Sequence, residues 1–382
     1  MDRRSTVKRL AVAAATALLA LFYRISRLFP VKRQVVCISR QSNHAPVDFL
    51  LLEEELAREE PPYRTVILAN KLESPLRYVP VMAKQVFFIA TSRAIVLDSY
   101  CIVVSLLGNR IKAPVVQIWH ALGNMKKFGY AALDTPEGHS SETARLMHMH
   151  EGYDAVAVSS LNFRGDLAAG FNVDPSIVFE APLPRVDLLR DPQFRSEQRD
   201  AFLQDHPEMA GKKTIVYCPT FRKTPAPNEK EAMRSLLSAV DFDRFNFVYM
   251  PHPVSRQALD DPRIITATRS GADPLFAADY VITDYSTVMY EAGLMDVPVY
   301  LYAYDWDTYH EKRSFNIDLA RDVPTLFTND AAAIATAIDL DQFDEQAFAR
   351  FTESNIATLA GESATQHLTR RIIALAEKQA TR

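Results

Sequence analysis

Short apolar runs recur along the chain, separated by longer stretches that mix apolar and polar residues. Several runs, such as Ala94–Leu97 and Val299–Tyr302, are apolar at every position, which is typical of strands buried on both faces of a parallel sheet. The intervening stretches have the length of helices, so the pattern predicts repeated strand–helix–strand units. The predicted strands are Val35–Ser39, Thr65–Ala69, Val86–Ala90, Ala94–Leu97, Val115–Ile118, Ala155–Val158, Ile177–Phe179, Thr214–Tyr217, Phe245–Tyr249, Ile264–Thr266, Tyr280–Thr283 and Val299–Tyr302.

A stretch rich in proline and charge, Pro182–Pro207, divides these strands into two sets, and 382 residues are enough for two or three domains. We predict an α/β protein with two Rossmann-like domains, residues 34–185 and 186–330. An amino-terminal segment, 1–33, precedes them, and terminal helices follow over 331–382. Two open sheets that face each other would bring the carboxyl ends of their strands to one central cleft.

Composition narrows the class of protein. Hydrophobic residues make up 48% of the chain and charged residues 24%, which excludes wholesale disorder. The three cysteines are too few and too far apart for a disulfide framework or a zinc cluster, and they fit a reducing compartment. Because no apolar stretch reaches the ~18–20 residues of a spanning helix, we also exclude a polytopic membrane protein.

The charge is distributed unevenly. Residues 1–33 carry eight Lys and Arg against one Asp, whereas the rest of the chain has 35 basic and 46 acidic residues. An acidic body lacks the basic face that nucleic acid requires. The run Leu10–Tyr23 is apolar except for Thr16, and as a helix it would be about 21 Å long, shorter than the ~30 Å hydrocarbon core.

These features predict a helix that lies in the membrane interface, with its basic residues among anionic head groups, on a peripheral protein of the cytoplasmic face. A helix packed on the body and a signal sequence are the alternatives. The residues after the apolar run, Tyr23 to Arg27, lack a cleavage site of small residues.

In the first domain, the strand Val115–Ile118 leads directly to His120, followed by Gly123, Lys126 and Lys127. A histidine at the end of a strand is well placed as a general base, because its pKa lies near neutrality. The two lysines would neutralise phosphates. The alternative is a histidine bonded to neighbouring backbone, beside solvated lysines.

In the second domain, the strand Phe245–Tyr249 leads to His252, which lies between two prolines. One imidazole from each sheet, meeting across a cleft, would suit an enzyme that handles a diphosphate. The strand Thr214–Tyr217 leads to further phosphate partners, namely Thr220, Arg222 and Lys223.

After the strand Tyr280–Thr283 comes a turn with Asp284, Ser286 and Thr287, at the start of a predicted helix. The amino end of a helix attracts anions, so the turn is a candidate phosphate site. Simple capping of the helix by Asp284 or Ser286 is the alternative.

Several common signatures are absent from the sequence: G-x-x-x-x-G-K-[ST], G-x-G-x-x-G, H-E-x-x-H and G-x-S-x-G. With only 11 glycines, phosphate binding must rest on helix ends, histidine, lysine and arginine. No clear carboxylate cluster predicts a metal site, although Asp284 could contribute to one. We therefore assign no cofactor and leave dependence on a divalent metal open.

The order of these motifs resembles the CDP-glycerol glycerophosphotransferase family over residues 35–330. The resemblance rests on Trp119-His120, Lys126-Lys127-Phe128-Gly129, Pro184-Arg185 with Asp187, Pro219-Thr220-Phe221-Arg222, His252-Pro253, Asp284-Tyr285-Ser286-Thr287 and a segment from Arg313 to Asp318.

The resemblance implies a GT-B architecture with an acceptor-side first domain and a CDP-donor-binding second domain. It implies a transferase that moves glycerol phosphate or ribitol phosphate from CDP-glycerol or CDP-ribitol and releases CMP, in teichoic acid or related polymer synthesis. The acceptor would be a hydroxyl of an undecaprenyl-diphosphate-linked saccharide or of a polyol-phosphate chain. The family often has Gly-Thr-Pro after the histidine, whereas this chain has Ala121-Leu122-Gly123, which leaves the CDP-alcohol open.

The predicted site follows from the motifs and the resemblance together. A glycosyltransferase that uses a nucleotide sugar and a non-catalytic nucleotide-binding membrane adaptor are the alternative functions. The predicted residues are His120 and His252 as catalytic groups; Thr220, Arg222, Lys223, Asp284, Ser286, Thr287, Lys126 and Lys127 for donor and phosphate; and Arg185 and Arg313 as further site residues.

Overall fold

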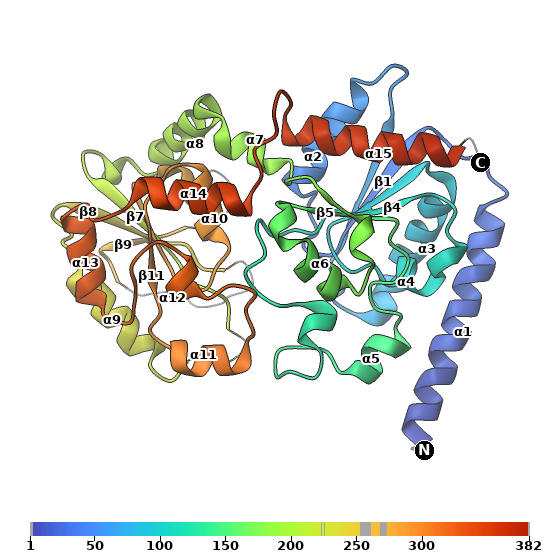
Figure 1. The fold of residues 1–382 in the computed structure, drawn as a ribbon, viewed down its shortest axis with the longest axis horizontal. Coiled ribbons are helices and arrows are strands. Elements are labelled where there is room, and N and C mark those ends of the chain that lie inside the picture. Colours follow the sequence, from blue (N-terminus) through green and yellow to red (C-terminus); the bar gives the residue numbers. More distant parts are fainter. Residues whose placement is uncertain (1–2, 223, 225, 253–260, 268–272, 381–382) are drawn as a thin grey trace. The chain divides into compact units, whose positions relative to one another are not determined.

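The computed structural model describes residues 3–380 except 223, 225, 253–260 and 268–272. The chain forms two compact units (Figure 1). The first comprises Met1–Arg185 together with Ile356–Arg382, and the second is the continuous segment Val186–Asn355.

The first unit is built on a parallel sheet in which six strands are described, in the order β2-β1-β3-β4-β5-β6. The strands β1 and β3 are buried at every position, as their uninterrupted apolar runs predict. The strand order reverses between β1 and β3, and ligands of open α/β sheets bind at such a switch point. The strands are β1 Gln34–Ser39, β2 Arg64–Ala69, β3 Ala94–Leu97, β4 Val115–Gln117, β5 Ala155–Val158 and β6 Val178–Glu180.

Helices cover both faces of this sheet. The last helix returns from the second unit to pack on α2 and β3, where Glu377 accepts hydrogen bonds from Arg33 (2.7 Å) and Arg93 (3.1 Å). The helices are α1 Arg3–Ser26, α2 Val47–Ala57, α3 Pro75–Thr91, α4 Ile102–Leu107, α5 Ser141–Leu146, α6 Arg164–Phe171 and α15 Ala364–Ala380, with short 3-10 turns η1 Gly108–Arg110, η2 Gly129–Ala132, η3 Leu161–Phe163 and η4 Pro175–Ile177.

One predicted strand is wrong. Val86–Ala90 lies within α3, which begins with Pro75 at its first turn. Val86, Ile89 and Ala90 are buried, whereas Phe87 and Phe88 are only partly so, which is the spacing of a helix face. A short run of apolar residues does not by itself distinguish a buried strand from a buried helical turn.

The amino-terminal helix α1 packs on α3 and α4 by one narrow face. Tyr23 is buried in the core of the first unit, and its hydroxyl accepts a hydrogen bond from the backbone N–H of Lys112 (3.0 Å). The opposite face is apolar and exposed, with Leu10 66% and Leu18 68% accessible.

The predicted length of this apolar helix needs correction, because α1 is one continuous helix that extends beyond the run Leu10–Tyr23. By length and composition alone, its part Thr6–Ser26 is long enough and apolar enough to cross a membrane, and within the described residues it is the one helix of this kind. Length therefore does not exclude a spanning placement for α1.

The second unit contains another parallel sheet, with six described strands in the order β12-β11-β10-β7-β8-β9. This order reverses between β7 and β10, as in dinucleotide-binding folds. Its core gathers aromatic and aliphatic side chains from the strands, α9 and α13. The strands are β7 Lys213–Cys218, β8 Phe245–Tyr249, β9 Ile264–Thr266, β10 Tyr280–Thr283, β11 Val299–Tyr302 and β12 Phe327–Thr328.

The helices of the second unit are α7 Arg185–Arg190, α8 Pro192–Asp205, α9 Glu229–Ala239, α10 Val288–Leu294, α11 Trp306–Lys312, α12 Leu319–Asp322, α13 Ala331–Asp339 and α14 Glu345–Asn355, with η5 Pro207–Met209 and η6 Pro274–Ala277. The predicted α/β class with two parallel sheets is confirmed. Of the predicted terminal helices, α13 and α14 belong to the second unit and α15 to the first. The assignment of an acceptor side and a donor side to the two units stays a prediction.

Candidate functional site

His120 lies at the carboxyl edge of the first sheet, beside the switch point between β1 and β3. Its Nδ1 is 2.9 Å from the backbone carbonyl oxygen of Asp98, the residue that follows β3. Because a carbonyl oxygen only accepts hydrogen bonds, Nδ1 carries the proton and Nε2 is the nitrogen that can take one up. The side-chain amide of Gln41, which follows β1, lies 3.2 Å from Nδ1 and can turn its oxygen toward it.

The protonation state of His120 suits a base. Burial lowers its pKa to about 4, and this effect outweighs the hydrogen bond with Asp98, which raises it. The imidazole is therefore neutral at neutral pH and available to accept a proton.

Trp119, immediately before His120, has a φ of 62°, a conformation rare for a bulky residue. Its backbone N–H donates to the side-chain oxygen of Gln117 (2.9 Å), and its ring stacks on Phe128 at 4.5 Å between centroids. The ring of Trp119 also lies 4.2 Å from that of His120. These contacts hold the strained turn that aims the imidazole at Asp98.

The motif Lys126-Lys127-Phe128-Gly129 follows on the same loop. Gly129 has a φ of 53°, and a Cβ at this position would lie 2.2 Å from the carbonyl oxygen of Gly170 on α6. Only glycine fits this close approach, so the end of the motif packs the loop against α6. Lys126 and Lys127 are partly buried, and the charge of Lys127 opposes the rise that burial causes in the pKa of Asp166.

Arg185, another predicted site residue, forms a largely buried ion pair with Asp48, whose side chain is 4% exposed. The Arg185 Nε donates to Asp48 Oδ2 and its backbone N–H to Oδ1, each at 2.9 Å. The charge of Arg185 further lowers the pKa of His120, while that of Asp48 raises it. This pair thus joins Arg185 to α2, and its two charges have opposite effects on the pKa of His120.

Sequence reasoning missed Gln41, Asp48 and Asp98. Gln41 and Asp98 follow buried strands, so the rule that selected His120 would have selected both. Asp48 lies in the first turn of a helix and gave no such signal.

In the second unit, Arg222 is 7% exposed and lies between two carboxylates. Its Nε and Nη2 donate to Asp305 (both 2.7 Å), and Nη2 also donates to Asp284 (2.8 Å). Its Nη1 donates to the carbonyl of Thr220 at 2.9 Å, so at least four of the five N–H groups of Arg222 are engaged. Burial lowers the pKa of this guanidinium, but the carboxylates raise it by more.

These contacts join the loops after β7, β10 and β11 at the second switch point. Asp284 Oδ1 also accepts from the backbone N–H groups of Thr220 (2.8 Å) and Tyr285 (2.6 Å). The observed role of Arg222 and Asp284 is therefore to position these loops, which differs from the direct phosphate contact that we predict for them from the sequence. Direct contact with phosphate stays a prediction.

Other predicted residues lie at the same carboxyl edge. The exposed ring of His252 is 5.5 Å from that of Phe221. Ser286 Oγ accepts from the N–H of Val288 (3.3 Å), the first residue of the seven-residue α10, whose N-cap is Thr287. Arg313 directly follows α11 as its C-cap, and its backbone N–H donates to the carbonyl of Tyr309 (3.0 Å). Lys223 and Pro253 lie outside the described residues.

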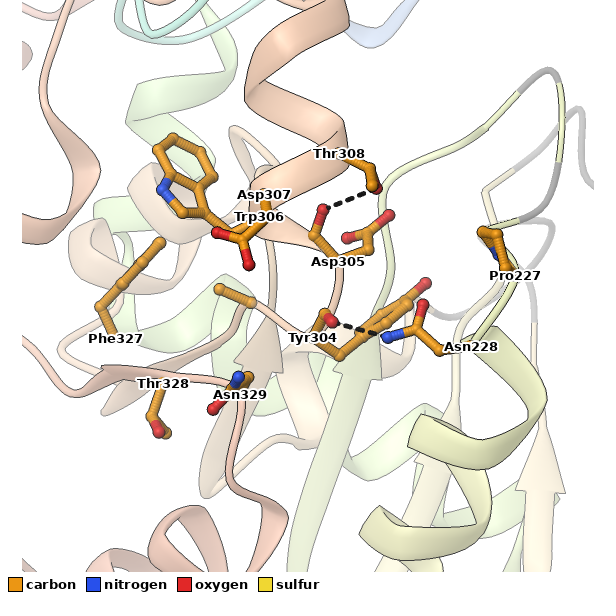
Figure 2. Close-up of a pocket in the computed structure, with 11 residues that line it drawn as sticks. Pro227, Asn228, Tyr304, Asp305, Trp306, Asp307, Thr308, Phe327, Thr328 and Asn329 are labelled. Carbon is orange, nitrogen blue, oxygen red and sulfur yellow. Dashed lines mark hydrogen bonds between the residues drawn. The ribbon is translucent and has the colours of Figure 1, made fainter.

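A pocket of about 480 Å³ lies at the carboxyl ends of β11 and β12, and its lining residues are drawn in Figure 2. Aromatic rings of Tyr304, Trp306 and Phe327 line it, beside polar side chains. The amide of Asn228 donates to the carbonyl of Tyr304 (2.8 Å) and fixes one wall. A pocket of this size with mixed walls suits a small molecule. Sequence reasoning predicted none of its lining residues, which come from three separate segments.

Within the described ranges, no group of three or more His, Cys, Asp or Glu residues could hold a metal ion. The three cysteines are free and buried.

The family model described as CDP-glycerol:poly(glycerophosphate) glycerophosphotransferase matches residues 21–374. The chain belongs to this family. The predicted family and its transferase class are thus confirmed, and this glycerophosphotransferase family member is an enzyme of the CDP-polyol phosphotransferase type.

Among curated relatives of this family member, a teichoic acid ribitol-phosphate primase of Bacillus spizizenii is 27% identical over 354 residues, covering 89% of this chain and 91% of the relative. A teichoic acid poly(ribitol-phosphate) polymerase of the same species is 28% identical over 325 residues, 81% of this chain and 51% of its own. A solved structure of the wall teichoic acid polymerase TagF has a TM-score of 0.74 at 18% identity, covering all of both chains. The last likeness shows that the fold is shared.

Proposed function

We propose that the protein transfers a polyol phosphate, either ribitol phosphate or glycerol phosphate, from a CDP-polyol to a hydroxyl of a lipid-linked acceptor. Family membership and the similarity to primases and polymerases that handle these two polyols support the proposal. The acceptor is a saccharide or polyol-phosphate chain carried on a polyprenyl diphosphate.

The hydrogen bond between His120 Nδ1 and the carbonyl oxygen of Asp98 (2.9 Å) carries the proposal, because it leaves Nε2 as the nitrogen that can accept a proton. The neutral Nε2 removes the proton from the acceptor hydroxyl, while Nδ1–H stays bonded to the carbonyl of Asp98. The acceptor oxygen forms a bond to the phosphorus that bears the polyol. The bond from that phosphorus to the bridging oxygen breaks, and CMP leaves with the electron pair. A positioned base of this kind contributes roughly 10²–10⁴-fold to the rate.

We propose that the donor binds the second unit. Thr220 follows β7, His252 follows β8 and Ser286 and Thr287 follow β10, so all four come after the carboxyl ends of neighbouring strands, and the pocket in Figure 2 lies at the carboxyl ends of β11 and β12. We infer that these groups hold the diphosphate and the nucleoside, with His252 facing the charge that develops on the leaving CMP.

The exposed apolar face of α1 supports attachment to a membrane. We infer that the protein lies on the cytoplasmic face, where its basic residues next to α1 meet anionic head groups.

The test is CMP release by purified protein given CDP-ribitol or CDP-glycerol together with a lipid-linked acceptor. We expect turnover with at least one donor, and its loss in His120→Ala with donor affinity unchanged. The matched control is His139→Ala, an exposed histidine in the loop before α5. Turnover of a UDP-sugar with no CMP release from either donor would contradict the proposal.

A further inference from the structure

A groove of about 560 Å³ in the first unit lies between the amino-terminal half of α1 and the region around α5. Its walls combine basic side chains with small or aliphatic ones, such as Ala13 on α1 and Leu146 on α5. No residue of this groove belongs to the site around His120.

Three arginines from three different elements converge on the groove: Arg9 on α1, Arg110 at the end of η1 and Arg145 on α5. Glu142 offsets one of them, so the arginines and the carboxylate of the lining sum to a charge of +2. Arg110 and Arg145 each use one N–H for a carbonyl of their own turn, Leu107 and Ser141 respectively, at 3.3 Å. Their remaining donors suit phosphate oxygens, which arginine binds through paired hydrogen bonds.

The α1 wall of the groove is formed mainly by small and aliphatic residues, namely Val12, Ala13 and Ala17. The exposed residues Leu10 and Leu18 lie outside the groove, on the face of α1 that points away from the body. A ligand with its head among the arginines can therefore place an apolar tail against Val12, Ala13 and Ala17, while the exposed face of α1 meets the membrane.

The groove is linked to the catalytic edge through the end of α5. The hydroxyl of Tyr100 donates to the carbonyl of Met147 (3.0 Å), and Tyr100 lies two residues after Asp98, whose carbonyl holds His120. In Figure 1 the amino-terminal half of α1 passes α5, and its amino end projects beyond α5.

We propose that this groove binds the diphosphate head group of an isoprenoid lipid, with the start of the chain against Val12, Ala13 and Ala17 of α1. The net charge of +2 matches a head group with two negative charges on phosphate. Phosphatidic acid has the same chemistry, and the choice of an isoprenoid diphosphate rests on the proposed function, which requires a lipid-linked acceptor.

The experiment measures binding of farnesyl diphosphate to the full-length protein in phosphatidylcholine nanodiscs, without any CDP-polyol. Inorganic pyrophosphate tests the head group without a tail, and dihexanoyl phosphatidic acid tests the other lipid source. The variants are Arg110→Gln combined with Arg145→Gln, which removes charge, and Ala13→Trp, which fills the groove. The matched control is Arg24→Gln, an exposed arginine of α1 outside the groove.

We expect saturable binding of farnesyl diphosphate that weakens about tenfold per arginine removed, because each charge-assisted hydrogen bond lost has about that effect. Ala13→Trp weakens binding as well, and Arg24→Gln leaves it within about twofold, since it removes only diffuse surface attraction. Equal binding by the double variant, pyrophosphate binding as tight as that of farnesyl diphosphate, or tighter binding of phosphatidic acid would each overturn the assignment.

Failure of this assignment can be told apart from failure of the proposed function. If the groove is assigned correctly, His120→Ala binds farnesyl diphosphate normally and the double variant still releases CMP with a soluble acceptor that lacks the lipid diphosphate. A protein that transfers polyol phosphate but binds farnesyl diphosphate equally well with and without the two arginines refutes the groove alone.

Discussion

The position of the acid limb in the pH profile of kcat/KM tests the environment of His120. An ordinary histidine with a pKa of about 6.5 would lose its function as a base below that pH. In the structure, burial lowers the pKa of His120 to about 4. A base is active when deprotonated, so a lowered pKa moves the acid limb to lower pH.

The two cases differ most near pH 5.5. There an unshifted histidine would be deprotonated in about one tenth of the molecules, whereas a group with a pKa of about 4 is deprotonated in nearly all of them. The assay is CMP release at low donor concentration from about pH 4.5 to about pH 8, over which circular dichroism verifies that the protein stays folded. We expect kcat/KM to be nearly constant between about pH 5.5 and 7 as far as His120 determines it.

Asp98 is the control, because burial raises the pKa of its carboxyl to about 6. Titration of the Asp98 carboxyl would produce a second acid limb in the pH profile of kcat/KM near that pH, whereas the backbone carbonyl of Asp98 accepts the hydrogen bond from His120 at any pH. Asp98→Asn removes such a limb and leaves the one from His120. A limb near pH 6.5 that persists in Asp98→Asn and matches the titration of His120 by NMR would refute our reasoning.

Three further outcomes are expected. Arg222→Met leaves the buried carboxylates of Asp284 and Asp305 without their counter-charge, which lowers the free energy of unfolding in urea by about 3–5 kcal/mol; a loss below about 1 kcal/mol would contradict the buried pair. Gly129→Ala places a Cβ at a positive φ and against α6, so we expect it to lower the free energy of unfolding by about 1–3 kcal/mol, measured as a lower melting temperature. Gly165→Ala is the matched control, because nothing lies within 4 Å of a Cβ at that position. Replacing Leu18 by Gln weakens sedimentation with vesicles at least about tenfold and leaves the fold intact, because this side chain faces away from the body; unchanged sedimentation would place the membrane contact elsewhere.

Most strands were predictable because they are buried on both faces, and their apolar runs end where polar loops begin. Phe245–Tyr249 and Tyr280–Thr283 have the predicted bounds. The run Val86–Ala90 failed because its helical spacing emerges only over the whole of α3. The edge strand Phe327–Thr328 was missed, since two residues carry no periodicity.

The candidate site was predictable only where the chain itself places a residue after a strand. His120 met that condition, and its tautomer became visible only through the carbonyl of Asp98, 22 residues away. The sequence identified Arg222 as a cation but not its partner Asp305, which lies 83 residues further on. Contacts between distant loops therefore decide whether a charged side chain can contact a ligand or is engaged in ion pairs within the protein.

The path of α15 governs how the protein can be dissected. Because the final helix completes the first unit, the second unit is an uninterrupted segment inserted into its neighbour. Residues 186–355 can be produced as one piece, but the first unit requires residues 1–185 to be fused to 356–382. A truncation before Ala364 would remove Glu377, the hydrogen-bond partner of Arg33 and Arg93, and would expose the face of α2 on which α15 packs. It would therefore destabilise the unit that contains His120, although the cut lies far from His120 in sequence.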